Sequence, residues 1–249
     1  MFNIIYSEFL KLKRCYIIIA ALIAAIFVPV IECIVSLLHD YSGISSALRF
    51  TYIKDDKVST EIICFQFLYM VIFALLAGYI FSREFTDGTA NTLYTYPMGR
   101  IKIFIGKFIT LFIIIFFIYV IQFMASYLML YIAWGKLPLK DFFMTDIKVT
   151  AYSMLLQLLL LPIPIFIGSM TKNVIFPIVY GILGAISSVF FMTTGIYMQM
   201  SPLMLPALPI YYFYEGDPID FVLTGRSAVL TFGISIFLCL YHFHKADIN

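Results

Sequence analysis

Six long apolar runs dominate the sequence, and most polar residues lie in the stretches between them. A helix that crosses a bilayer needs roughly 20 mostly apolar residues, and the runs approach that length. The pattern predicts an all-α integral membrane protein, a single transmembrane domain of residues 1–249 with six transmembrane helices. The expected spans are residues 16–38, 62–81, 108–133, 151–170, 174–194 and 228–242, and residues 221–223 extend the last one.

The stretches between the runs differ in character. Residues 171–173 are so short a connection that the fourth and fifth spans should form a tight helical hairpin, and Pro162, Pro164 and Pro177 should kink these helices. Residues 39–61 and 134–150 are polar and are expected to be external loops. Residues 195–225 are rich in Pro but also in Leu, Met and Tyr, so we expect a re-entrant external segment of one or two short helices.

Composition excludes a soluble protein. Hydrophobic residues make up 63% of the chain and charged residues 12%, whereas soluble domains carry roughly 25% charged residues. No polybasic block is present, so no nucleic-acid partner is expected. The four cysteines show no CxxC spacing, and we expect no metal site and no cofactor in this chain.

The distribution of Lys and Arg indicates the topology. With the N-terminus inside, nine of these residues fall on the inner side and seven on the outer side, and the inner ones lie closer to the ends of the spans. We therefore expect a multi-pass protein of the cell membrane with both termini in the cytoplasm. Membrane lipid is then a direct partner.

The connection between the second and third spans, residues 82–107, carries the most informative pattern: SREFTDGTANTLYTYPMGRIKIFIGK. Acids at the start of a short helix would suit its positive dipole end, a Gly-Thr pair would permit a tight bend, and Pro would end the helix. A bent segment of this kind, lying along the cytoplasmic face, could be displaced by a soluble partner. The residues expected to form it are Glu84, Asp87, Gly88, Thr89, Leu93, Pro97, Arg100 and Lys107.

The pattern of residues 1–14, at the N-terminus, predicts a helix that lies in the membrane interface. Its apolar residues recur at helical spacing, and its charged residues occupy the rest of the wheel. The charged residues are Glu8, Lys11 and Arg14.

These two segments resemble the corresponding parts of type-2 ABC transporter permeases. Residues 84–107 share that family's acid, Gly-Thr, apolar run, Pro, Arg and Lys, and residues 7–14 resemble its N-terminal interface helix. Six spans and an apolar segment before the last span are also similar. In size and amino-acid composition, the chain looks closest to bacitracin-resistance and lantibiotic-immunity permeases.

The resemblance implies that the transporter is built from several chains with different roles. A second permease, identical or paralogous, would pair with this one, and a separate cytoplasmic ABC ATPase would bind ATP and Mg. Residues 84–96 would be the coupling helix on that ATPase, and residues 195–225 the external gate. The chain itself would be a non-enzymatic transport subunit, because it lacks a phosphate-binding loop: Gly106-Lys107 is followed by Phe108 instead of Ser or Thr.

Two features leave alternatives open. Glu32 is the only ionisable residue expected well inside a span, and it either lines a path for a cationic or amphipathic substrate or reaches the outer headgroups. Small residues also lie four apart on the fifth span, Gly181 with Ala185 and Gly184 with Ser188, and on the first, Ala20 with Ala24 and Ala21 with Ala25. They pack either within one chain or across a pair of permeases, for which the first span is the main candidate.

The function expected from these patterns is ATP-driven export of a hydrophobic or amphipathic substrate, with an antimicrobial peptide as the candidate. A membrane scaffold or immunity protein that binds a peptide without ATP is the main alternative. A secondary transporter is weaker, because such proteins place several polar groups near the midplane.

Overall fold

The chain is built from helices alone in the part that a computed structural model describes. The described residues are 2–13, 15–39, 45–88, 99–135 and 140–245, and no strand occurs among them. Six helices in these ranges are long and apolar enough to cross a membrane, which confirms the predicted fold class. They are Tyr16–Leu38, Leu48–Thr86, Arg100–Trp134, Lys140–Thr171, Ile175–Met192 and Phe221–His244.

The second, third and fourth of these helices are much longer than the sequence indicated. Helix α3 (Ser46–Ile62), the π-helix η1 (Ile63–Leu68) and α4 (Tyr69–Thr86) form one continuous rod. Helix α6 spans Arg100–Trp134, and α7 spans Lys140–Leu160.

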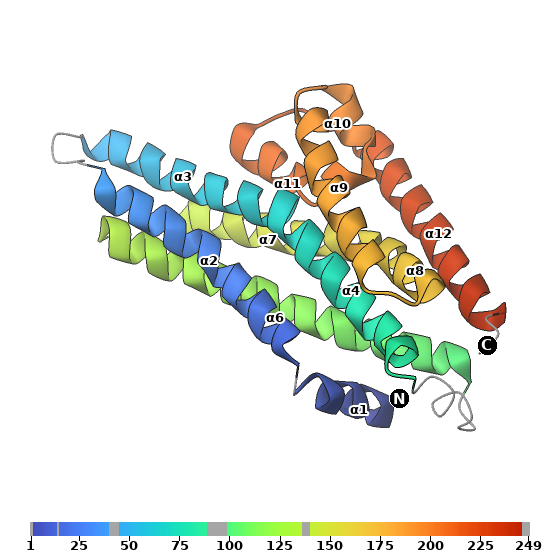
Figure 1. Ribbon diagram of the computed structural model, residues 1–249. Helices are drawn as coiled ribbons and strands as arrows, with labels where there is room; N and C mark the ends of the chain where they lie inside the picture. The colour runs from blue at the N-terminus through green and yellow to red at the C-terminus, as the bar shows by residue number, and fades with distance from the viewer. Residues whose placement is uncertain (1, 14, 40–44, 89–98, 136–139, 246–249) are drawn as a thin grey trace.

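The prediction of polar loops at residues 39–61 and 134–150 is therefore wrong for most of both stretches. Several of their polar side chains, among them Lys57, Glu61 and Asp146, are buried between α3, α6 and α7, while others on the same helices are exposed. Asp56 of α3 accepts a hydrogen bond from Nε1 of Trp134 at 2.9 Å. With these contacts, α3 and α7 extend beside α2 (Tyr16–Leu38) and α6 to one side of the molecule (Figure 1).

The π-helical turn η1 lies inside the core. The backbone N–H of Tyr69 donates to the carbonyl oxygen of Cys64, five residues earlier. Gln66, which is buried in this turn, donates to the hydroxyl of Ser188 on α9 (Ile175–Met192) at 3.3 Å. π-Helical turns are rare and occur frequently at functional sites.

Helices α4, α8 (Pro162–Thr171) and α9 meet at small residues. The fourth span breaks at Leu161, directly before Pro162, and Lys172 turns the chain with a φ of 54°, as the predicted kink and hairpin require. A Cβ on Gly78 would lie 2.8 Å from the ring of Pro177, and one on Gly168 would lie 3.1 Å from the Cα of Gly78.

The small face of α9 packs within the chain. A Cβ added at Gly181 would lie 2.9 Å from the backbone oxygen of Met70 on α4. Gly184, Ala185 and Ser188 are also buried. Of the two alternatives for this face, the structure selects packing inside one chain.

Residues 195–225 contain four short helical elements, more than the one or two expected, followed by an early start of the last span. The elements are α10 (Ile196–Met200), η2 (Pro202–Met204), α11 (Leu208–Ile210), η3 (Tyr211–Glu215) and α12 (Phe221–Lys245). Met204, Leu208 and Ile210 are buried against the rest of the bundle. That the segment dips into a membrane stays a prediction.

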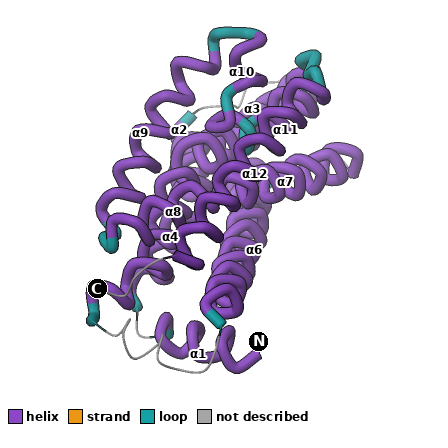
Figure 2. The backbone as a smooth tube through the Cα atoms, turned by 90° about the vertical axis from the view of Figure 1, so that its right-hand side faces the viewer, coloured by secondary structure: helices purple, strands orange, loops and turns teal. Residues whose placement is uncertain are grey.

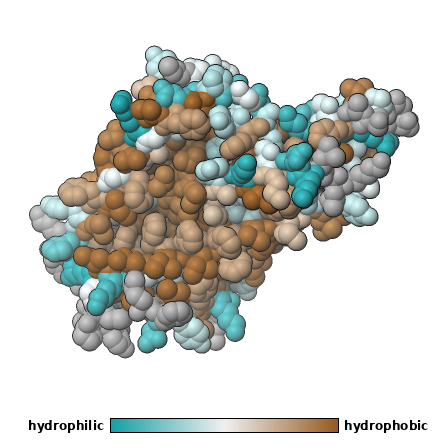
Figure 3. Space-filling model, turned by 180° about the vertical axis from the view of Figure 1, so that it is seen from behind, coloured by the Kyte–Doolittle hydropathy of each residue, from teal (hydrophilic) through white to brown (hydrophobic). Residues whose placement is uncertain are grey.

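The bundle has two distinct ends. Helix α1 (Phe2–Leu12) lies crosswise at one of them, together with the end of α4, the start of α6 and the end of α12 (Figures 1 and 2). We call this the α1 end, and the opposite one, which carries α10 and the tip of α3, the α10 end. Apolar side chains gather over the body between the ends, and polar ones appear at the ends and on the extension (Figure 3).

Candidate functional site

A buried carboxylate joins three helices at the α1 end. Glu84, in the last turns of α4, is 5% exposed. Its Oε1 lies 2.8 Å from Nζ of Lys11 on α1, and its Oε2 lies 2.9 Å from Nζ of Lys107 on α6. We call Glu8, Lys11, Glu84 and Lys107 the α1-end charge cluster.

Further contacts fix this cluster in place. Lys107 is itself buried and donates to the backbone oxygen of Ile80 at 2.9 Å. Glu8 lies 2.6 Å from Lys11, and Arg83 donates to the backbone oxygen of Lys11 at 3.1 Å. The cluster balances two carboxylates with two ammonium groups, so its burial leaves no net charge unpaired.

Lys11 is held in its charged form. Partial burial works to lower the pKa of its ammonium group, but the hydrogen bonds to Glu8 and Glu84 outweigh this effect and raise the pKa above its usual value. The pair Lys11–Glu84 is therefore ionic at physiological pH, and the attachment of α1 to α4 does not depend on pH in that range.

A second group of buried charges joins α3, α6 and α7 toward the α10 end. The Nζ of Lys57 lies 3.0 Å from Oε1 of Glu61 and 3.4 Å from Oδ2 of Asp146, and all three side chains are fully buried. The ammonium also lies 5.3 Å from the ring centroids of both Phe123 and Tyr127 on α6.

Helix η3 is attached to the same group. The hydroxyl of Tyr214 donates to Oδ1 of Asp146 at 2.9 Å, and its ring stacks on Phe142 with centroids 5.5 Å apart. Lys54 of α3 donates to the backbone oxygen of Tyr214 at 2.8 Å. The segment between α9 and α12 is thus bound to the buried charges of α3 and α7 by polar contacts.

Comparison with known proteins identifies the family. Residues 4–193 match the family described as ABC-2 family transporter protein, which is well over half of the chain. The chain belongs to the ABC-2 transporter family. Comparisons with the curated proteins and with the solved structures found no match. As a member, the chain is the membrane component of an ABC transporter, and the family implies an ABC ATPase as its partner.

In this ABC-2 permease, the predicted coupling residues separate into buried and exposed ones. Glu84 and Lys107 are buried and form an ion pair with each other, so neither charge is exposed at the surface. Asp87, exposed at the end of α4, lies 3.0 Å from Nε of Arg83. Gly88 follows with a φ of 66°, the bend that the sequence predicted. Arg100 begins α6.

One expectation about this region is wrong. Glu84 does not begin a helix but lies in the last turn of α4, and Asp87 is the C-cap of that helix, where the helix dipole disfavours acids. The cations of α1 and α6 and the nearby Arg83 offset this cost. The remaining predicted members lie outside the described residues: Thr89, Leu93, Pro97 and Arg14.

Helix α1 buries a different face from the one that its sequence predicted. Its buried residues are Ile4, Glu8 and Leu12, so Glu8 faces the protein and not a polar surface. A Cβ added at Gly106 of α6 would lie 2.6 Å from Cγ2 of Ile4. The permease thus holds α1 by close packing as well as by the α1-end charge cluster.

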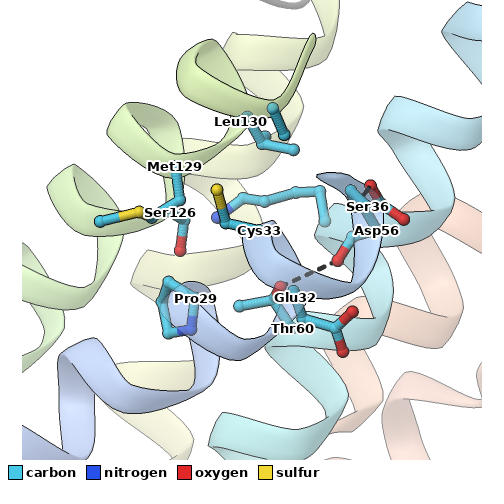
Figure 4. A pocket seen from close by; sticks show the side chains of 11 residues that line it. Pro29, Glu32, Cys33, Ser36, Asp56, Thr60, Ser126, Met129 and Leu130 are labelled. Carbon is cyan, nitrogen blue, oxygen red and sulfur yellow. Dashed lines mark hydrogen bonds between the residues drawn. The ribbon is translucent and has the colours of Figure 1, made fainter. Parts of the chain in front are cut away.

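Glu32 lines a small pocket between α2, α3 and α6 (Figure 4). The pocket has a volume of about 10 Å³, enough for about one water molecule. Ser36 on its wall donates to Oδ2 of Asp56 at 2.6 Å. A pocket of this size holds no substrate, so a role for Glu32 in transport would require the helices to separate.

Sequence reasoning missed Lys57, Glu61 and Asp146. It assigned all three to external loops, and it expected Glu32 to be the only ionisable residue well inside a span. A signal was present: Lys57 and Glu61 are four residues apart, the spacing at which opposite charges pair along a helix.

Proposed function

We propose that this chain is the permease subunit of an ATP-driven exporter and that its ATPase docks at the α1 end. The observation that supports this proposal is the α1-end charge cluster, which fastens α1, α4 and α6 together at one face. A force applied there acts on three helices at once, because none of them can move relative to the others without breaking an ion pair.

The rod formed by α3, η1 and α4 gives a route for that force. It is continuous from the α1 end to the buried group around Lys57. Motion of the rod would therefore reach Asp146 and, through it, Tyr214 of the external segment. We infer that residues 195–225 act as a gate that the rod releases.

In this proposal the α1 end faces the cytoplasm, with both termini inside. A second permease, identical or paralogous, completes the path, and lipid surrounds the exposed apolar belt (Figure 3). The substrate class is hydrophobic or amphipathic, and a lantibiotic-like or bacitracin-like peptide removed for resistance or immunity is the candidate. The alternative is a scaffold or immunity protein that binds a peptide without ATP.

The test is affinity purification of the tagged chain from its native membrane in mild detergent, with the copurified ATPase quantified. The informative variant is Asp87→Lys, which reverses an exposed charge beside the cluster without removing any member of it. The matched control is Asp141→Lys, an exposed acid at the start of α7.

The expected result is a near-stoichiometric ATPase with the wild type and with Asp141→Lys. Asp87→Lys should retain about fivefold less ATPase, as ~1 kcal/mol of lost surface attraction gives. If no ATPase accompanies the wild type even after crosslinking, the scaffold alternative replaces the exporter. An equal loss in both variants would show that the α1 end is not the docking face.

A further inference from the structure

A large cavity lies between α7, the external-segment helices α11 and η3, and the start of α12. Its volume is about 700 Å³, within the roughly 300–1,000 Å³ typical of sites that bind small molecules. It is separate from both groups of buried charges and from the pocket at Glu32, and residues of the proposed gate, 195–225, form part of its wall.

Aromatic side chains form the walls of this cavity. Tyr152 of α7 and Phe213 stack with ring centroids 5.9 Å apart and planes 17° apart. Tyr212 and Phe221 meet edge to face with centroids 5.3 Å apart. Such pairs make rigid apolar walls, which favour an apolar body in the space between them.

The polar groups of the cavity are few and unpartnered. Lys148 is the only residue with a formal charge at neutral pH among those that line it. Its side chain is exposed, and within the described residues it forms no ion pair. The hydroxyl of Thr224 is buried and likewise lacks a hydrogen-bond partner in the described part of the chain. A cation and an orphaned hydroxyl beside apolar walls suit a ligand with one anionic, hydrogen-bonding group.

The floor of the cavity on α12 is lined by small residues. Gly225 and Ala228 both line the space, and a Cβ added at Gly225 meets no atom within 4 Å. On the same helix, Phe221 is 66% exposed and Val229 70% exposed. The cavity therefore lies beside the apolar surface that faces lipid, from which a membrane-dissolved molecule can enter.

We propose that this cavity binds a single amphiphile, with its anionic group at Lys148 and Thr224 and its apolar chain between the aromatic pairs. Two sources supply such chemistry: an anionic lipid of the surrounding membrane, and a compound that the transporter exports. The binding site stands without the proposed function; only the choice of an exported compound rests on it.

Binding is tested on the purified chain alone. Oleoyl lysophosphatidylglycerol is titrated in detergent and bound copies are counted by native mass spectrometry, with mono-oleoylglycerol as the uncharged probe. Lys148→Gln should weaken lysophosphatidylglycerol binding about tenfold, as loss of one charge-assisted contact gives, and should leave mono-oleoylglycerol binding unchanged. Lys140→Gln, an exposed cation two turns earlier on α7, should change neither.

A second pair of variants tests the cavity itself. Gly225→Leu places a side chain in the open space and should abolish binding of both probes. Gly233→Leu, on the same helix and also without a neighbour within 4 Å, should retain it. Equal binding of lysophosphatidylglycerol by the wild type, Lys148→Gln and Gly225→Leu would overturn the proposal.

The source of the ligand is decided in vesicles of phosphatidylcholine that contain the permease with its ATPase and a fluorescent lysophosphatidylglycerol. ATP-dependent movement of the probe between leaflets that Gly225→Leu lacks identifies an exported compound. Binding without movement identifies a resident lipid. If no ATPase associates with the chain, the proposed function fails while the binding measurements still stand.

Discussion

Glu84 joins three helices through its side chain alone. Its two carboxylate oxygens accept separate cations from helices that are distant in sequence, Lys11 and Lys107. Because the side chains of Glu84 and Lys107 are shielded from water, their pairing is screened far less than a surface ion pair. Removing one partner leaves the other charge buried and uncompensated.

Replacement Glu84→Gln should therefore destabilise the purified protein by about 3–5 kcal/mol, measured as thermal or denaturant unfolding in detergent. Asp141→Asn, at an exposed acid of α7, is the control and should have little effect. The double variant Glu84→Gln with Lys107→Met should recover part of the loss, because no buried cation remains unpaired. Unchanged stability in Glu84→Gln would show that the cluster does not hold the helices.

Among the helices, close backbone approach at glycine governs how α4, α8 and α9 pack. Gly181 leaves room for the backbone of Met70, and Gly78 leaves room for the ring of Pro177. A backbone atom cannot move aside as the end of a long side chain can. These positions therefore fix the spacing of the helices that support η1.

The substitution Gly181→Ala should destabilise the protein by about 1–3 kcal/mol, the usual cost of overpacking. Gly233→Ala on α12 is the matched control, since nothing lies within 4 Å of its added Cβ. There the better helix propensity of Ala should leave stability unchanged or raise it by about 1 kcal/mol at most. Equal effects of the two substitutions on the melting temperature would contradict this packing account.

Which features of the fold could be predicted from the sequence also depends on the element concerned. The spans, the break before Pro162 and the turn at Gly88 could be predicted, because each depends on local chemistry. The groups around Glu84 and Lys57 could not, since their partners come from helices far apart in the chain. Polarity in residues 39–61 indicated loops, whereas the structure buries Lys57 and Glu61 against Asp146.

At the scale of the whole molecule, the helices are longer than a membrane is thick. The rod from Leu48 to Thr86 has 39 residues and so is about 58 Å long, while the hydrocarbon core is about 30 Å thick. With the α1 end at the cytoplasmic face, the tip of α3 stands outside the membrane.

This arrangement predicts how cysteine probes react in intact cells. Thr51→Cys, exposed near the tip of α3, should react with a membrane-impermeant maleimide, and Thr86→Cys, exposed at the α1 end, should react only after lysis. Cys15 is replaced by Ser in both, and the other three native cysteines are buried. Labelling of Thr86→Cys in intact cells would reverse the proposed orientation.

The position of Gly78 within the rod has a mechanical consequence. At Gly78 the rod packs closely against the ring of Pro177, and Gly78 lies about 12 Å from Thr86 but about 45 Å from Leu48 at 1.5 Å per residue. A rigid tilt about that contact makes the rod a lever with arms of unequal length. A displacement of the short arm at the α1 end is then magnified roughly fourfold at the far tip, by the same helical rise.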